Sequence, residues 1–147
     1  MVKAQEYVLL YQCGMMKVKS EKKVLIAADN PDILVSVKEG LEAMDKKIEV
    51  IPVNSGEECL SLLMNKKLLP DVILLDIMLP EMTGWEVYTR LREKEEWKSI
   101  PVVFITARTD HKAKEIGTFL GEDYIEKPFE IDELKVRIER VLKRKGV

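Results

Sequence analysis

Cysteine, histidine and aromatic residues are scarce in this chain, and the scarcity limits what it can be. Its 147 residues include two cysteines and one histidine, and no metal-binding spacing links Cys13 and Cys59. Nothing in the sequence pairs His111 with either of them. Two thiols without a disulfide framework are typical of a reducing compartment, so we expect a cytoplasmic protein.

The chain also lacks a long apolar run and an excess of charge of one sign. Its apolar N-terminal stretch, YVLLYQCGMM, is interrupted by Gln12 and is too short to span a bilayer. It has no small-residue cleavage site of the kind that follows a secretory signal. The net charge of −2 favours neither nucleic acid nor a membrane surface as a partner. We therefore expect a protein that binds neither.

The length and composition indicate one globular domain. With 46% hydrophobic residues, a chain of this size can bury a substantial core. We interpret residues 1–21 as an N-terminal extension outside the fold, either disordered or laid on the surface. Residues 22–147 are expected to form the domain.

Strand and helix signals alternate from residue 23 onward. Short apolar runs predict buried strands at 24–28, 48–53, 71–75, 101–106 and 123–126. Helical spacing and capping signals predict helices over about 31–44, 55–66, 83–93, 110–119 and 131–142. The capping signals are Asn30 with Pro31, and the pairs Ser55 with Glu58 and Thr83 with Glu86. This alternation predicts an α/β fold, a doubly wound parallel sheet covered on both faces.

Four polar residues fall where the predicted strands end. Asp29, Asp76, Thr106 and Lys127 follow the first, third, fourth and fifth strands. Ligands of such sheets bind at the carboxyl ends of the strands, where these four side chains can converge. Two carboxylates there repel each other unless a cation joins them, and oxygen ligands suit Mg²⁺. With a metal and a lysine bound, the site favours an anion, for which a phosphoryl group is the natural candidate.

Three segments together resemble a known family. DVILLDIMLPEMTGWE, VVFITAR and DYIEKPF are similar, in order and spacing, to the receiver domain of two-component response regulators. The resemblance covers residues 23 to about 145. It implies a flavodoxin-like receiver with a five-stranded parallel sheet in the order 2-1-3-4-5.

The resemblance also implies roles for individual residues. Asp76 matches the phosphoacceptor, and Asp29, Asp76 and the backbone carbonyl of Met78 match the ligands of the Mg²⁺ cofactor. Lys127 matches the lysine that pairs with the phosphoryl group, and a cis Lys127–Pro128 bond is expected to turn it towards Asp76. The phosphoryl-binding and switch positions are Thr106, Ala107, Lys127 and Tyr124, and the positions that shape the acceptor loop are Pro80 and Gly84.

Two departures from the family pattern stand out. The residue before Asp29 is usually a second acid that holds the metal through water, and here it is Ala28. We expect the alanine to weaken metal binding, and with it phosphoryl transfer. The segment GEDY is one residue shorter than the usual GADDY, which points to an altered output surface.

Since no DNA-binding domain follows the last predicted helix, we expect a stand-alone receiver rather than an enzyme. A sensor histidine kinase would phosphorylate it, and a histidine phosphotransfer protein or another effector would respond, with the receiver a monomer or weak homodimer. A degenerate receiver that binds partners without phosphorylation remains the main alternative, which Ala28 favours. An aspartyl phosphatase is disfavoured because position 78 is methionine rather than an acid. A flavin-binding protein is disfavoured because no phosphate-binding loop rich in serine, threonine and glycine follows the first strand.

Overall fold

The computed structural model describes residues 22–65, 68–107, 115 and 123–144. Its elements are β1 (Lys22–Ala27), α2 (Pro31–Met44), β2 (Ile48–Val53), α3 (Gly56–Asn65), β3 (Val72–Asp76), α4 (Gly84–Glu93), β4 (Val102–Ala107), β5 (Asp123–Lys127) and α6 (Ile131–Arg144). The extension predicted for residues 1–21 and the helix predicted for 110–119 lie outside the described residues, apart from the single position 115.

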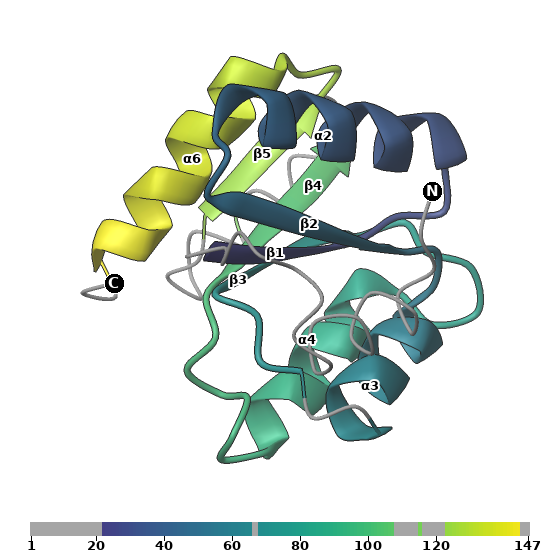
Figure 1. Ribbon diagram of the computed structural model, residues 1–147. Coiled ribbons are helices and arrows are strands. Elements are labelled where there is room, and N and C mark those ends of the chain that lie inside the picture. Colours follow the sequence, from purple (N-terminus) through teal and green to yellow (C-terminus); the bar gives the residue numbers. More distant parts are fainter. Residues whose placement is uncertain (1–21, 66–67, 108–114, 116–122, 145–147) are drawn as a thin grey trace.

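The five strands form one parallel sheet in the order β2-β1-β3-β4-β5. This confirms both the fold class and the strand order expected from the sequence. Figure 1 shows α2 and α6 on one face of the sheet and α3 and α4 on the other. Because β1 and β3 are neighbours although β2 lies between them in sequence, the chain reverses its winding direction there. The carboxyl ends of β1 and β3 consequently lie side by side.

Each face of the sheet buries its own apolar core. Alternate strand residues point to opposite faces, so Leu75 and Phe104 pack with α3 and α4. Leu74 and Ile105 pack with α2 and α6 on the other face. The central strands are therefore apolar on both sides, which explains why their sequence runs are continuous rather than alternating.

Local sequence signals place the helix starts as expected. The side chain of Asn30 accepts a hydrogen bond from the Asp32 N–H at 2.9 Å and caps α2. The Ser55 hydroxyl accepts from the Glu58 N–H at 3.1 Å, and Thr83 caps α4 in the same way through the Glu86 N–H at 3.3 Å. These contacts satisfy N–H groups that have no partner inside the helix.

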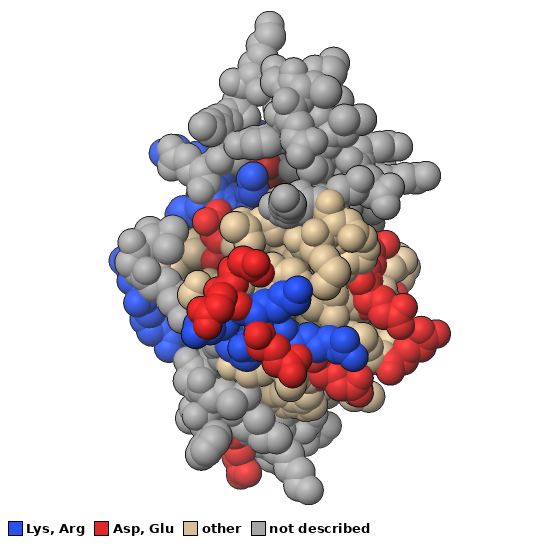
Figure 2. Space-filling model, turned by 90° about the horizontal axis from the view of Figure 1, so that it is seen from below, with Lys and Arg blue, Asp and Glu red and all other residues tan. Residues whose placement is uncertain are grey.

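The surface charge is mixed. Figure 2 views the side that carries α3 and α4, where a line of basic side chains has acidic side chains on either side and an uncharged area next to it. Such a pattern gives no broad field of one sign for a polyanion to follow. In the described part of the chain, no helix combines the length and the apolar character needed to cross a bilayer.

Candidate functional site

Asp76 is a buried carboxylate at the end of β3. Its side chain is only 1% exposed. Oδ1 accepts a hydrogen bond from the Met78 N–H at 2.9 Å, and Oδ2 lies 2.7 Å from the Lys127 ammonium. A carboxylate at this depth is tolerated only when it is paired and hydrogen-bonded, and both conditions are met. Lys127 thus lies against Asp76, the residue towards which the sequence analysis expected it to turn.

Lys127 reaches Asp76 from β5 across the intervening strand β4. It is the last residue of β5, and the Lys127–Pro128 peptide bond is cis, which confirms the prediction made from the resemblance. The lysine side chain is 32% exposed, so part of it faces solvent while its ammonium contacts the buried carboxylate. A group arriving at Asp76 from solvent would therefore meet this cation.

Thr106 lies on β4, the strand between Asp76 and Lys127. Ile105 is the register partner of Asp76, and Ala107 is the register partner of Lys127, so Thr106 sits at the same level of the sheet. Thr106 is 1% exposed, and its hydroxyl has no hydrogen-bond partner within the described part of the chain. A buried hydroxyl in that state is unfavourable by about 1–3 kcal/mol. Ala107, next to it, is exposed.

The predicted metal ligands lie at the same edge but are differently exposed. Ala27 of β1 pairs in register with Leu75 of β3, so Asp29 follows β1 at about the level where Asp76 ends β3. Asp29 is exposed, and Met78 is 69% exposed. Two carboxylates and a backbone carbonyl are hard oxygen donors of the kind that Mg²⁺ accepts together with water.

Ala28 fills the position where a third acid is expected. It is fully buried in the core formed with α2 and α6, and its N–H donates to the Val53 carbonyl at 3.2 Å. Among the described residues, no group of three or more histidine, cysteine or acidic side chains could enclose a metal ion. The donor set fits Mg²⁺ in ligand type but supplies fewer anionic groups than the family pattern.

The loop after Asp76 is packed tightly against the end of β3. The Gly84 N–H donates to the Ile77 carbonyl at 2.9 Å. A Cβ added to Gly84 would lie 2.5 Å from the Asp76 carbonyl oxygen, so only glycine allows this approach. Pro80 and Met82 close the turn within the loop, and Glu81 adopts a φ of 63°. The start of α4 therefore helps to fix the backbone at Asp76.

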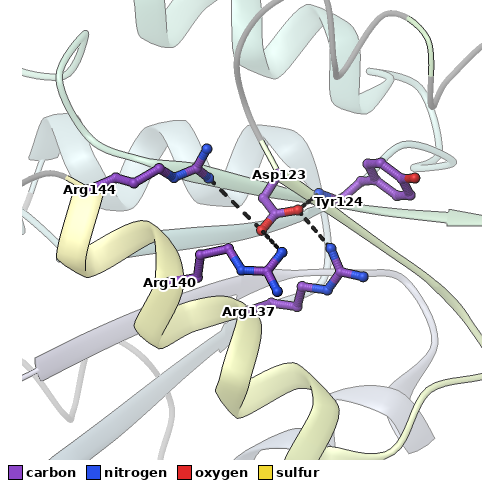
Figure 3. A network of polar contacts seen from close by, with 5 residues as sticks. All are labelled: Asp123, Tyr124, Arg137, Arg140 and Arg144. Atoms are coloured by element: carbon purple, nitrogen blue, oxygen red, sulfur yellow. Dashed lines mark hydrogen bonds and ion pairs between the residues drawn. The ribbon is translucent and has the colours of Figure 1, made fainter.

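Tyr124 connects the site to α6. It is partly buried on β5 against the core formed with α3 and α4, and the Arg137 guanidinium lies 5.8 Å from its ring centroid. The neighbouring Asp123 accepts a hydrogen bond from Arg137 at 2.9 Å and lies within 3.9 Å of Arg140 and Arg144. Figure 3 shows the three arginines of α6 gathered around this one carboxylate. The sequence analysis missed this network, although arginines at positions 137, 140 and 144 share one face of a helix.

An apolar groove next to Lys127 was also not foreseen. Its volume is about 560 Å³, and it lies between the first half of α2 and the segment joining β5 to α6. Ile33, Val37, Phe129 and Ile131 supply its apolar lining, with Ala107 and Lys127 at one side. The lysine that contacts Asp76 therefore borders a surface suited to an apolar contact.

Comparison with known proteins gives a consistent result. A family model described as the response regulator receiver domain matches residues 24–139. The transcriptional regulatory protein CiaR of Streptococcus pneumoniae is 39% identical over 125 residues, covering 84% of this chain and 53% of CiaR. The chain spans about half the length of the curated relatives it matches first.

Solved structures show the same likeness in three dimensions. The receiver domain of the Francisella response regulator 1452 is 32% identical with a TM-score of 0.73, covering 84% of this chain and 98% of that chain. The chemotaxis protein CheY4 of Vibrio cholerae is 29% identical with a TM-score of 0.72, covering 84% of this chain and 99% of that chain.

Proposed function

The chain belongs to the response regulator receiver family, and on this premise we propose that Asp76 accepts a phosphoryl group from a histidine kinase and thereby switches a protein-interaction surface. A receiver domain is a signalling module rather than an enzyme. Membership implies a two-component system and hence a histidine kinase as partner. The identity of the phosphorylated residue and the response to it are the parts that we propose.

The observation that carries the proposal is the buried hydroxyl of Thr106. It lies one strand from Asp76, without a hydrogen-bond partner among the described residues. A phosphoryl group on Asp76 would bring acceptor oxygens to this level of the sheet, and the hydroxyl could then donate to one of them. The phosphorylated state would satisfy a group that the present state leaves unsatisfied.

The chemistry follows from the contacts of Asp76. One carboxylate oxygen attacks phosphorus, the bond between phosphorus and the kinase histidine nitrogen breaks, and an acyl phosphate forms. Lys127, 2.7 Å from Oδ2, is placed to pair with the transferred group. A bound Mg²⁺, held by Asp29, Asp76 and the Met78 carbonyl, would neutralise part of the phosphoryl charge.

The response would pass through β4 and β5. Phe104 and Tyr124 are register partners, and Thr106 lies two residues beyond Phe104 on the same face. A movement of Thr106 towards Asp76 changes the space available to the Tyr124 ring, which lies near Arg137 of α6. We therefore assign the switched surface to β5 and α6, where a phosphotransfer protein or other effector would bind.

The groove beside Lys127 is a suitable contact for the phosphodonor. It places apolar side chains of α2 and of the segment 128–131 next to the lysine that contacts Asp76. A kinase helix bearing the phosphohistidine could rest there while its phosphoryl group reaches the carboxylate. We place this exchange in the cytoplasm, between a kinase and a monomeric or weakly dimeric receiver.

A receiver that binds partners without phosphorylation is the second candidate, and Ala28 favours it. The two candidate functions can be distinguished by incubating the protein with acetyl phosphate and Mg²⁺ and then measuring its intact mass. We expect one phosphoryl adduct, labile to alkali, that is absent from Asp76→Asn. Asp29→Asn should reduce the rate of incorporation without abolishing folding. No adduct on the wild-type chain, or an equal amount on Asp76→Asn, would refute the proposal.

A further inference from the structure

A second apolar groove lies at the opposite end of the sheet from Asp76. Its volume is about 360 Å³, and it is formed where α3 ends and where the chain leaves α4, by Leu63, Met64, Leu69, Lys94, Glu96 and Trp97. Met64 and Leu69 are 53% and 57% exposed. Both flanking connections lead into the starts of strands, so this groove, here called the α3–α4 groove, has no contact with the phosphorylation site.

The chain enters the fold beside this groove. β1 begins at Lys22, so residues 1–21 join the domain there. The Asp71 N–H donates to the Lys23 carbonyl at 2.9 Å, and the Lys23 N–H donates to Asp71 Oδ2 at 2.7 Å. Asp71 follows Leu69, a groove residue, by only two positions. The extension therefore starts next to the groove.

The extension contains an apolar segment of suitable length and position. Residues 7–11 read YVLLY, the longest uninterrupted apolar run of the first 21 residues. The ten residues 12–21 can span up to about 35 Å when extended, which is ample for a site beside the entry point. Exposed apolar side chains on one surface and a tethered apolar segment nearby favour their association.

A buried acid near the entry point gives an independent reason to expect the extension there. Glu49 is 5% exposed, and neither of its carboxylate oxygens has a hydrogen-bond partner among the residues that the structure describes. It is the register partner of Lys23, and since Ile48 and Val50 face α2 and α6, its side chain faces the α3 side. Lys23 lies on the same face but makes no hydrogen bond to Glu49, and a buried carboxylate without a hydrogen bond is unfavourable. The extension carries Lys17 and Lys19 a few residues before β1.

We propose that residues 7–11 dock into the α3–α4 groove and that a lysine at position 17 or 19 pairs with Glu49. The extension then forms part of the folded domain and covers Met64 and Leu69. The groove is closed to a second copy of the chain and to other proteins as long as the segment occupies it. This inference does not depend on phosphorylation of Asp76.

The two cysteines allow a direct test on the full chain. Cys59 is fully buried and burial raises the pKa of its thiol to about 12, so a thiol-specific nitroxide reacts at Cys13, two residues after the apolar segment. The chain has two tryptophans, of which Trp97 lines the groove and Trp85 does not. In ¹⁵N spectra we expect the label to broaden the indole N–H signal of Trp97 and the amide signals of Met64 and Leu69, and to leave the Trp85 indole sharper.

Matched variants identify the contact. Met64→Glu should restore the Trp97 signal, whereas Met44→Glu, the same change at a residue of similar exposure (49%) on α2, should not. Leu9→Ser with Leu10→Ser should also restore it, and Glu49→Gln should restore it in part. Unbroadened Trp97 in the labelled wild-type chain would overturn the proposal. Broadening in ¹⁵N Cys13→Ser protein mixed with labelled unenriched protein would overturn it too, because the occupant would be a second copy.

Discussion

Thr106 carries a polar hydroxyl in a buried position that offers it no hydrogen-bond partner among the described residues. Its hydroxyl is buried without a partner in the described structure, while the carboxylate one strand away is fully paired. We expect Thr106→Val, which keeps the shape and removes the hydroxyl, to leave the unphosphorylated protein as stable or up to about 2 kcal/mol more stable. Urea unfolding measures this difference. In the same variant, the protein's spectrum should no longer change when acetyl phosphate and Mg²⁺ are added.

Thr106→Ser provides the control, because it restores a hydroxyl without the methyl group. It should recover the response to acetyl phosphate while losing some stability from the removed packing. A marked destabilisation by Thr106→Val would show that the hydroxyl has a stabilising partner, and the role assigned to it would be wrong.

Ala28 illustrates how burial changes the meaning of a substitution. The sequence identifies the missing acid but not its environment, in which Ala28 is fully buried between β1 and α2. An alanine here strengthens the apolar core at the point where the family pattern places a charge. The residue therefore stabilises the metal-free protein through packing, and the cost is one anionic group fewer beside Asp29 and Asp76.

At the scale of the elements, the apolar runs predicted the strands closely and the capping residues predicted the helix starts. These signals are local, so one sequence carries them. The sequence could not show that β1 ends at Ala27, because Ala28 is equally apolar and its N–H still bonds to Val53. It also missed the network of Asp123, because an acid at the start of a predicted strand indicates no partner until α6 is placed against β5.

For the candidate site, the sequence predicted the positions of residues at strand ends but not their contacts. The positions of Asp76 and Lys127 follow from strand ends, and the family resemblance predicted the cis bond that the structure contains. Among the described residues, Thr106 and Glu49 have no hydrogen-bond partner for their side chains, a state that depends on every neighbouring atom and has no sequence signature. The two apolar grooves are likewise formed by segments distant in sequence.

The network on α6 leads to a prediction for that helix. Of the three arginines, Arg137 donates a hydrogen bond to Asp123, whereas Arg140 and Arg144 lie 3.8 and 3.9 Å away with more than half of their side chains exposed. We expect Arg137→Met to destabilise the fold by about 2–3 kcal/mol, since it leaves a buried charge poorly compensated. Arg140→Met and Arg144→Met should each cost no more than about 0.5–1 kcal/mol, because exposed pairs are weak. Thermal unfolding at low salt measures the stability of each of the three variants. Equal losses of stability in all three would contradict this ranking.

The whole molecule rests on two separate cores, one on each face of the sheet, and the thiol of Cys59 reports on the core beneath α3 and α4. Burial, and to a smaller extent the charge of Glu58, raises the pKa of this thiol from 9.0 to about 12. In the unfolded chain the thiol ionises near its ordinary pKa. Below pH 9 the thiol keeps its proton in both the folded and the unfolded state, so it contributes no pH dependence to the stability. Between pH 9 and 12 only the unfolded state loses it, so stability falls as the pH rises.

This dependence can be isolated by comparing two chains that both carry Cys13→Ser, one with Cys59 and one with Cys59→Val. Lysine and tyrosine titrations are common to both and cancel in the difference. Valine is similar in size and cannot ionise, so the fall in unfolding free energy from pH 7 to pH 10 should be smaller in the variant by about 1.4 kcal/mol. Urea unfolding under reducing conditions at the two pH values measures it. Because Cys59 lies at the centre of one core, equal falls would mean that the thiol reaches solvent in the folded protein and that this core opens without global unfolding.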